Sequence, residues 1–206
     1  MFIRIALLLS AFAAGPLLAQ PPAAASPVQT PAQEDLVPVA IDTSLGRIVV
    51  ALDRGRAPIT TAHFRHYVDS HRFDGETFYR AMHSPGSGLI QGGVRSDIRK
   101  LFAPIADEPT TTTGLHNVAG AISMARLEPN SAQADFFILT TDMRGLDAGA
   151  PGGDADGFAV FGHVIEGMDV VGKIYNSPIS PTKGEGAMKG EMLDPPVKII
   201  KVARVK

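Results

Sequence analysis

The sequence predicts a mainly β domain, a closed eight-stranded antiparallel β-barrel with two capping α-helices. From residue 37 onward, short apolar runs of strand length alternate with turns rich in Gly, Pro and Asp. Only two segments have the apolar spacing and flanking turn residues that are typical of helices. The chain has 206 residues, 45% of them hydrophobic, which is enough to bury one core. About eight strands and two helices in one domain favour a barrel with helices over its ends.

The first elements are a hairpin and a helix. Strands are predicted at residues 37–42 and 47–52, joined by the turn Thr43-Ser44-Leu45-Gly46. A helix is predicted at 58–70, because Pro58 stands in its first turn and apolar residues then recur with helical spacing.

The remaining elements follow the same alternation of apolar runs and turns. Further strands are predicted at residues 77–80, 89–91, 119–124, 135–140, 158–164 and 197–204. A second helix is predicted at 168–175, after the turn Glu166-Gly167. The Gly-rich stretches 145–157 and 180–195 and the threonine run 110–113 are predicted to be surface loops.

Residues 1–19 have the features of a secretory signal peptide. Arg4 is their only charge, residues 5–14 are apolar, and Gly15-Pro16 breaks the run before Ala19, which suits the last position before cleavage. An uncleaved membrane anchor is the alternative interpretation, but the run is shorter than the roughly 20 residues that a spanning helix needs. We therefore expect export to the periplasm, with no stable membrane insertion after cleavage.

A tether separates this signal from the folded domain. Residues 20–36 are rich in Pro, Ala and Gln and lack the aromatic residues that offset ordering entropy, so we expect them to be disordered. This leaves residues 37–206 as the folded domain, which we expect to be a monomer. The sequence contains no cysteine, so an exported form would rely on its core alone.

The charge of the chain argues against nucleic-acid partners. The formal net charge is −2, and loss of residues 1–19 would remove one positive charge and no negative one. There is no basic run and no interleaving of basic with aromatic residues, so binding of nucleic acid is not expected.

Arg80 and Gln91 form the most informative pair of residues. Arg80 ends an aromatic run, and Gln91 follows a Ser/Pro/Gly turn and precedes Gly92-Gly93. Arginine offers planar, permanently charged donors, and glutamine is long enough to hold them. If both face an apolar pocket, the site suits a neutral polar substrate better than an anion or a metal. From the residues alone, Arg80 is more readily explained as a surface cation at a strand end, and Gln91 as a turn cap.

Three other patterns are incomplete as metal or nucleophile sites. His63 and His66 share a helix face, but no carboxylate or cysteine completes a metal site. The segment 154–157 is similar to half of a calcium loop and lacks the later bidentate glutamate. Ser84 and Ser87 lie near a histidine without the sequence of a nucleophile elbow. We therefore expect no metal and no cofactor.

A series of motifs follows along the domain: Gly46–Leu52, Ala57–Phe64, Asp74–Arg80, Gln91-Gly92-Gly93, Gly120–Arg126, Phe136-Phe137-Ile138 and Phe158–Asp169. In order and spacing they resemble the cyclophilin family of peptidyl-prolyl cis–trans isomerases, in its bacterial exported form. The resemblance covers about residues 38–204.

The resemblance implies roles for individual residues. It places the catalytic arginine of the family at Arg80 and its supporting glutamine at Gln91. The residues implied in substrate binding are Phe137, Leu146, Leu89 and Phe158 in a proline pocket, with Met124 beside them, Ala125 and Arg126 at the backbone-binding pair, and Asp135. Ala125 is expected to pair its backbone with the substrate, as an edge strand would.

The sequence departs from the family pattern at the site. The link between Arg80 and Gln91 is longer, and the pocket Phe-Met of the family is Gly88-Leu89 here. Asp135 stands where the family usually has glutamine, and the family's tryptophan and histidine are Gly145 and Phe158. An ion pair between Asp135 and Arg80 would fix the guanidinium but compete with the substrate, so we expect reduced activity toward simple peptides.

The resemblance implies isomerisation of X–Pro bonds in unfolded or flexible proline-containing polypeptides, assisting the folding of exported proteins. This reaction breaks no covalent bond and needs no nucleophile, metal or cofactor. The main alternative is a non-catalytic proline-peptide-binding or chaperone module with a degenerate site. A structural partner in a larger envelope assembly is a third interpretation, based only on the long Gly-rich loops.

Overall fold

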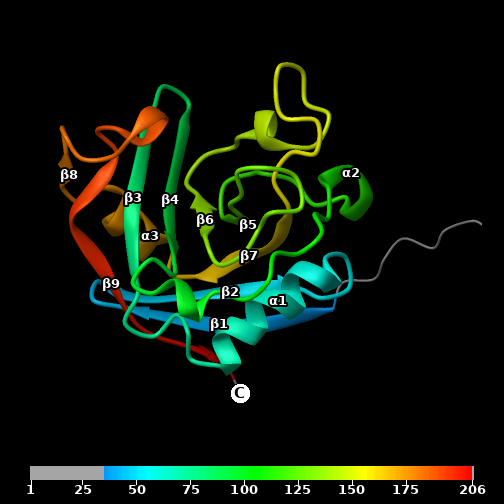
Figure 1. The fold of residues 1–206 in the computed structure, drawn as a ribbon, viewed down its shortest axis with the longest axis horizontal. Coiled ribbons are helices and arrows are strands. Elements are labelled where there is room, and N and C mark those ends of the chain that lie inside the picture. The colour runs from blue at the N-terminus through cyan, green and yellow to red at the C-terminus, as the bar shows by residue number, and fades with distance from the viewer. Residues whose placement is uncertain (1–34, 206) are drawn as a thin grey trace, which may run out of the picture. The chain divides into compact units, whose positions relative to one another are not determined.

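A computed structural model describes residues 35–205, in which β-strands are the predominant regular structure (Figure 1). The strands are β1 (Leu36–Thr43), β2 (Gly46–Asp53), β3 (Thr77–Ser84), β4 (Ser87–Gly93), β5 (Ala121–Met124), β6 (Phe136–Leu139), β7 (Val160–Glu166), β8 (Ile179–Ser180) and β9 (Met192–Arg204). The α-helices are α1 (Pro58–Asp69), α2 (Thr110–Thr113) and α3 (Met168–Tyr175). The predicted signal peptide and nearly all of the predicted tether lie outside the described residues.

The strands close into a barrel. Their order is β1-β2-β7-β5-β6-β4-β3-β9, and β9 pairs in turn with β1, with every pairing antiparallel. Within residues 35–205, strand β8 pairs only with β9. Closure removes the free edges at which sheets aggregate. The predicted eight-stranded antiparallel barrel is therefore confirmed.

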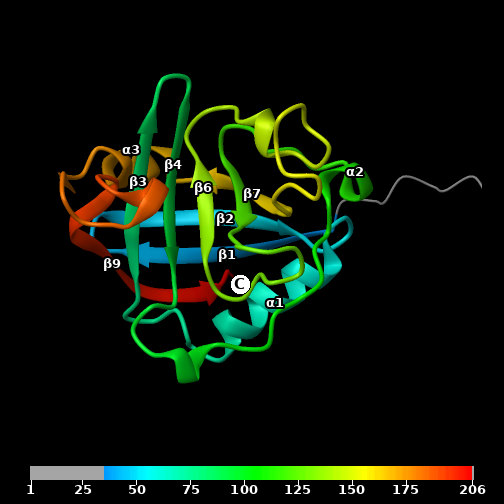
Figure 2. The same cartoon turned by 45° about the horizontal axis from the view of Figure 1, so that its top comes forward.

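Alternate residues of the strands fill the barrel. Val39 and Ile41 of β1, Leu52 of β2 and Val202 of β9 are completely buried, as expected where successive side chains point to opposite faces of a sheet. An aromatic cluster joins this core to α1: Phe64 packs edge-on against Phe136, at 5.3 Å between ring centroids. The helices α1 and α3 lie at opposite ends of the barrel (Figures 1 and 2).

Helix α1 is capped by a residue distant in sequence. Its N-cap residue, Ala57, has no side chain that can accept a hydrogen bond. The backbone N–H groups of Ile59 and Thr60 instead donate to the buried carboxylate of Glu108, at 3.0 and 2.7 Å. A carboxylate at this position also interacts favourably with the helix dipole.

The threonine run was predicted as a loop and needs correction. Residues 110–113 form the single turn α2, a third helix beyond the two predicted. Gly114 ends it in the left-handed conformation, with φ of 68°, which glycine adopts at little cost.

Strand β9 is longer than predicted. It begins at Met192 and passes through Pro195 and Pro196, where a loop was expected. The register against β3 shifts between the pairs Phe78–Val197 and Arg80–Met192, so the prolines occupy an irregular stretch that needs no ladder N–H. Within residues 35–205, no helix has the length and apolar character needed to cross a bilayer.

Candidate active site

The outer face of the barrel carries a second apolar cluster, distinct from the core. Its buried members are Leu89, Ala121, Phe137, Leu139 and Val160, and its partly buried members are Met82, Leu115, Ala125, Met143, Leu146 and Phe158. The β3–β4 hairpin and the loop at 147–157 lie on either side of β6 at this face (Figures 1 and 2). We name this set of side chains the outer cluster.

Strand register places Arg80, Gln91 and Phe137 in one row. Arg80 of β3 is the direct partner of Gln91 of β4, which in turn is the direct partner of Phe137 of β6. The pairing of β3 shifts between Phe78 and Arg80. This irregularity lets Phe78 enter the core while the next two side chains, Tyr79 and Arg80, contact groups outside it. The row brings a charged donor to the edge of the outer cluster.

Arg80 is held from two sides. Its Nη1 donates to Gln91 Oε1 at 2.8 Å, as the sequence predicted. Its Nε donates to Glu191 Oε2 at 2.8 Å, and its Nη2 lies 2.7 Å from the same oxygen. The Arg80 side chain is only 15% exposed and that of Glu191 19%, so the ion pair is largely shielded from water.

Glu191 is not among the site residues that the sequence indicates. It stands 111 residues after Arg80, in a stretch that was predicted to be a loop. The pairing of Arg80 with Met192 across β3 and β9 brings it into place, and Ala81 N–H donates to the Glu191 carbonyl at 2.9 Å. Its only sequence signal was proximity to the predicted closing strand.

The expected ion pair between Asp135 and Arg80 needs correction. Asp135 Oδ2 instead accepts a 2.8 Å hydrogen bond from the hydroxyl of Tyr79, and the guanidinium of Arg95 lies 4.4 Å from the centre of the Tyr79 ring. Burial raises the pKa of the Asp135 carboxyl above its usual range. Asp135 therefore leaves the donors of Arg80 free.

A glycine allows Asp135 to sit at this position. Gly93 has a φ of 155°, and a Cβ on it would lie 2.1 Å from Asp135 Oδ1. No side chain can be accommodated there without moving the carboxylate. Glycine at position 93 therefore allows the end of β4 to lie close to Asp135.

Four of the predicted pocket residues come together. The rings of Phe137 and Phe158 pack edge-on at 5.6 Å between centroids, and Leu89 and Leu146 belong to the same outer cluster. The Phe158 N–H donates to the Leu146 carbonyl at 2.9 Å, which fixes their spacing. These side chains provide an apolar surface beside Arg80.

Met124 does not join this surface. It is 2% exposed and packs in the barrel core, because Ile122 and Met124 share the inward face of β5. Its predicted place beside the proline pocket is corrected accordingly. The neighbouring Ala125 packs against the outer cluster, but its N–H already donates to the Asp135 carbonyl at 2.8 Å.

Arg126 is buried rather than directed at a substrate. Its side chain is 2% exposed, with Nε 3.1 Å from Asp107 Oδ2 and Nη2 2.9 Å from Asp154 Oδ1. The hydrogen bond from Arg126 lowers the pKa of Asp154. Arg126 thus ties the 147–157 loop to the barrel, and its side chain is engaged within the protein.

A buried polar network supports the loop from its other end. Asp147 accepts hydrogen bonds from the backbone and side-chain nitrogens of Asn117, at 2.8 and 3.0 Å. Asn117 also donates to the Phe158 carbonyl at 3.2 Å and accepts from Ser123. Burial alone would raise the pKa of Asp147, but the hydrogen bonds from Asn117 and His116 hold that pKa below its usual range.

The histidines and acidic residues considered for metal binding have other partners. His63 lies 2.6 Å from the Gln133 carbonyl, His66 stacks on Phe102 at 3.7 Å, and Asp154 binds Arg126. Among residues 35–205, no group of three or more His, Cys, Asp or Glu side chains is placed to hold a metal ion.

Comparisons with known proteins identify the family. The family model described as "Cyclophilin type peptidyl-prolyl cis-trans isomerase/CLD" matches residues 38–204. The chain is 40% identical over 167 residues to a peptidyl-prolyl cis-trans isomerase of Acinetobacter baylyi, covering 80% of this chain and 83% of that protein. It is 34% identical over 140 residues to peptidyl-prolyl cis-trans isomerase B of Escherichia coli, covering 66% of this chain and 82% of that protein.

Solved structures agree in fold. A cyclophilin-type peptidyl-prolyl cis-trans isomerase of Cryptosporidium parvum superposes with a TM-score of 0.64 at 20% identity, covering 84% of this chain and 99% of that one. The same protein was also crystallised in the presence of the dipeptide Ala-Pro. The family model spans nearly all of the described residues, the barrel is that of the solved relatives, and the chain therefore belongs to the cyclophilin-type peptidyl-prolyl cis-trans isomerase family.

Proposed function

We propose that this chain accelerates cis–trans isomerisation of X–Pro bonds in unfolded or flexible polypeptides of the periplasm. The observation that carries the proposal is the row Arg80–Gln91–Phe137, in which a fixed guanidinium borders an apolar surface. Family membership supports the same activity, since the relatives named above are peptidyl-prolyl isomerases.

The reaction needs stabilisation of a twisted amide. Rotation about an X–Pro bond faces a barrier of roughly 18–20 kcal/mol, because amide resonance is lost at the midpoint. In the twisted state the proline nitrogen recovers a lone pair and the amide dipole falls. An N–H of Arg80 can donate to that lone pair, and the surface formed by Phe137 and Phe158 favours the less polar state over the planar one.

The hydrogen bond from Arg80 supplies only part of the required lowering of the barrier. A hydrogen bond from a charged donor supplies about 1.5–3 kcal/mol. An acceleration on the order of 10⁵-fold requires about 7 kcal/mol. Arg80 alone is therefore insufficient, and the outer cluster and the grip on the flanking peptide must contribute the remainder.

The longer hairpin keeps apolar contact at the site. A Cβ on Gly88 would lie 2.3 Å from Thr140 Oγ1 and 2.9 Å from the Tyr175 hydroxyl, so this position packs against other parts of the fold and has no room for a pocket side chain. Leu89 and Met82, which are direct partners across β3 and β4, both pack in the outer cluster. They supply apolar surface in place of the family's pocket phenylalanine.

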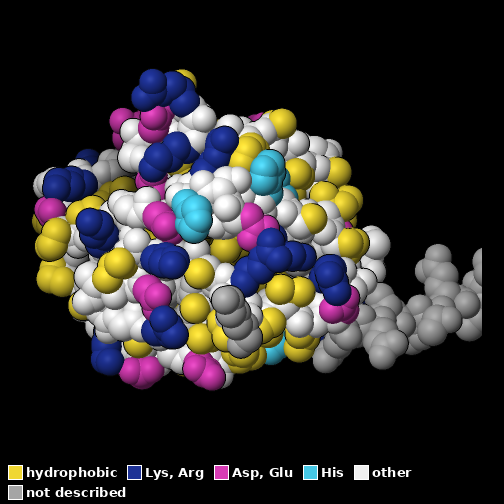
Figure 3. Space-filling view, turned by 90° about the horizontal axis from the view of Figure 1, so that it is seen from below, with side chains coloured by type: hydrophobic (Ala, Val, Ile, Leu, Met, Phe, Trp, Pro, Cys, Tyr) yellow, Lys and Arg dark blue, Asp and Glu magenta, His cyan; other side chains and the backbone are white. Residues whose placement is uncertain are grey.

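Two departures from the family pattern favour a non-catalytic proline-peptide-binding module: Gly88, and Asp135 if it contacts Arg80. The second no longer applies, because Asp135 binds Tyr79. On the face shown in Figure 3, Lys and Arg side chains are interspersed with Asp and Glu, so that face offers no concentrated field for a charged partner.

Exchange NMR on an Ala-Pro peptide, or proline-limited refolding of a protein, tests the proposal. Wild type should accelerate the exchange, and Arg80→Ala should lose most of the acceleration while still binding peptide. Peptide binding without acceleration by the wild type would favour the non-catalytic module. Export is tested separately, by sequencing the N-terminus of the mature protein from the periplasmic fraction of a bacterial host.

A further inference from the structure

Glu191 forms the ion pair on the arginine of the proposed active site, and it lies on a segment that carries no expected site residue. We propose that Glu191 is a positioning residue, which fixes the plane of the Arg80 guanidinium so that its remaining N–H groups face the substrate. The inference rests on the proposed isomerase function, but it makes a claim about Arg80 that can be measured without turnover.

Gln91 alone cannot fix the guanidinium. Its Oε1 accepts from Nη1 only, and a single hydrogen bond leaves the planar group free to rotate about that contact. Glu191 Oε2 engages the opposite edge, with Nε at 2.8 Å and Nη2 at 2.7 Å. Contacts on two edges of a rigid plane define its orientation.

Donors remain for the substrate. A guanidinium has five N–H groups, and the contacts with Gln91 and Glu191 occupy at most three of them. At least two N–H groups are therefore without a partner among the described residues. Because the Glu191 carboxylate balances the charge of Arg80, the pair suits an uncharged amide better than an anionic ligand.

Glu191 is itself held in place. Its backbone N–H donates to the Met188 carbonyl at 3.1 Å, and its carbonyl accepts from Ala81 N–H at 2.9 Å. Its side chain is 19% exposed. By contrast, Glu185 on the same segment is exposed and makes no side-chain cap contact at the adjacent 3₁₀ turn. Glu185 therefore offers a control with the same change of charge.

The first test compares turnover with binding. Glu191→Ala should lower the isomerisation rate about tenfold, and Glu191→Gln, which keeps an oxygen acceptor at the same length, should lower it about threefold. Peptide affinity, measured by NMR titration, should change less than about twofold in both variants, since the interaction acts on the twisted state. Glu185→Ala and Glu185→Gln should retain the wild-type rate.

A double-mutant cycle shows whether Glu191 acts through Arg80. In an Arg80→Ala background, Glu191→Ala should cause no further loss, because the residue it positions is gone. An equal loss in both backgrounds would overturn the inference. An unchanged rate in Glu191→Ala or Glu191→Gln would also overturn it. A faster enzyme would overturn it and would show that Glu191 competes with the substrate for Arg80.

The second test reads Arg80 directly. The Nε–H signal of Arg80 in ¹H–¹⁵N spectra should exchange with water at least about tenfold faster in Glu191→Ala, whereas Gln91→Ala, which removes the contact at Nη1, should change it less than about twofold. Equal exchange in Glu191→Ala and wild type would overturn the inference even if the isomerase function holds. An inactive wild type would contradict the isomerase function, and the exchange rate of the Arg80 Nε–H would still test whether Glu191 positions Arg80.

Discussion

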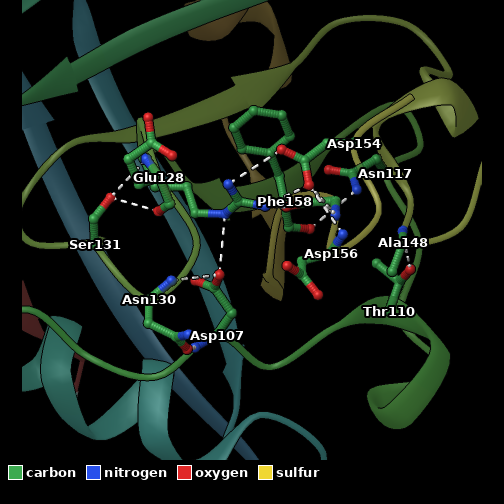
Figure 4. Close-up of polar contacts among 12 residues, drawn as sticks. Asp107, Thr110, Asn117, Glu128, Asn130, Ser131, Ala148, Asp154, Asp156 and Phe158 are labelled. Atoms are coloured by element: carbon green, nitrogen blue, oxygen red, sulfur yellow. Dashed lines mark hydrogen bonds and ion pairs between the residues drawn. The ribbon is translucent and has the colours of Figure 1, made fainter. Parts of the chain in front are cut away.

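The guanidinium of Arg126 lies 5.3 Å from the centre of the Phe158 ring, so a buried cation packs against a ring of the outer cluster. The same guanidinium contacts Asp107 and Asp154, which come from different segments of the chain (Figure 4). The Asp107 side chain is 7% exposed and precedes α2, whereas Asp154 belongs to the 147–157 loop. One side chain therefore joins two loops to the wall of the proposed proline pocket.

Arg126→Ala should destabilise the protein by about 3–5 kcal/mol, because it leaves the buried carboxylate of Asp107 with the Asn130 N–H but without a cation. Denaturant unfolding measures this directly. Asp154→Asn should cost less than about 1 kcal/mol, since Asp154 is 39% exposed and keeps an oxygen acceptor. Equal losses in the two variants would contradict a role for Arg126 that centres on Asp107.

Asp135→Asn should change the pH dependence of stability. Burial raises the pKa of Asp135 in the folded state above its unfolded value of about 4. The contribution of this carboxyl to the free energy of unfolding is therefore complete below about pH 4. It is lost as pH rises through the folded pKa. Wild type should therefore lose stability relative to Asp135→Asn as pH rises above about 4. Parallel curves from pH 3 to 7 would show that Asp135 titrates normally.

Asp135→Gln should leave the isomerisation rate within about twofold of wild type. The substitution would raise the rate if Asp135 held Arg80 away from the substrate, but Asp135 binds Tyr79 instead. Peptide exchange at fixed pH measures the effect. A rise of about tenfold would restore the idea that Asp135 restrains Arg80.

Glu108→Ala should destabilise the protein by about 2 kcal/mol, because the N–H groups of Ile59 and Thr60 lose their buried acceptor. Glu128→Ala, at an exposed position, is the control and should fall within about 0.5 kcal/mol of wild type. A loss of helical circular dichroism in proportion to the shift in unfolding would place the effect at α1.

Gly88→Ala should cost about 1–3 kcal/mol, because the new Cβ would overlap Thr140 and Tyr175. Gly145→Ala is the matched control, since within residues 35–205 no atom beyond Gly145 and its two chain neighbours lies within 4 Å of the position of its Cβ. Thermal unfolding of both variants checks the difference. If Gly88→Ala is as stable as Gly145→Ala, the hairpin does not pack as closely as the structure indicates.

Local patterns were sufficient for most of the fold. The hairpin of β1 and β2, the helix at α1 and the position of α3 follow from apolar spacing and turn residues within each segment. The same locality made Arg80 and Gln91 recognisable, because a single hairpin brings them together as direct partners. The family motifs then linked that pair to Phe137, Leu146 and Phe158.

Long-range contacts account for what sequence could not supply. Glu191 reaches Arg80 only through the pairing of β3 with β9, and Glu108 caps α1 from 48 residues away. Met124 was predicted beside the pocket but lies in the core, because successive side chains of a strand point to opposite faces and a shift of one residue exchanges them. Asp135 was assigned to Arg80 by position in a motif, and its real partner, Tyr79, comes from β3, which β4 separates from β6.

The exchange rate of an Ala-Pro peptide in the presence of wild type, Arg80→Ala and Glu185→Ala tests the central claim most directly. Wild type and Glu185→Ala should accelerate exchange equally. Arg80→Ala should lose at least about tenfold of the acceleration, in keeping with the loss of one charged hydrogen bond in the twisted state. Acceleration by Arg80→Ala equal to that of wild type would contradict the assignment of this face of the barrel as the active site.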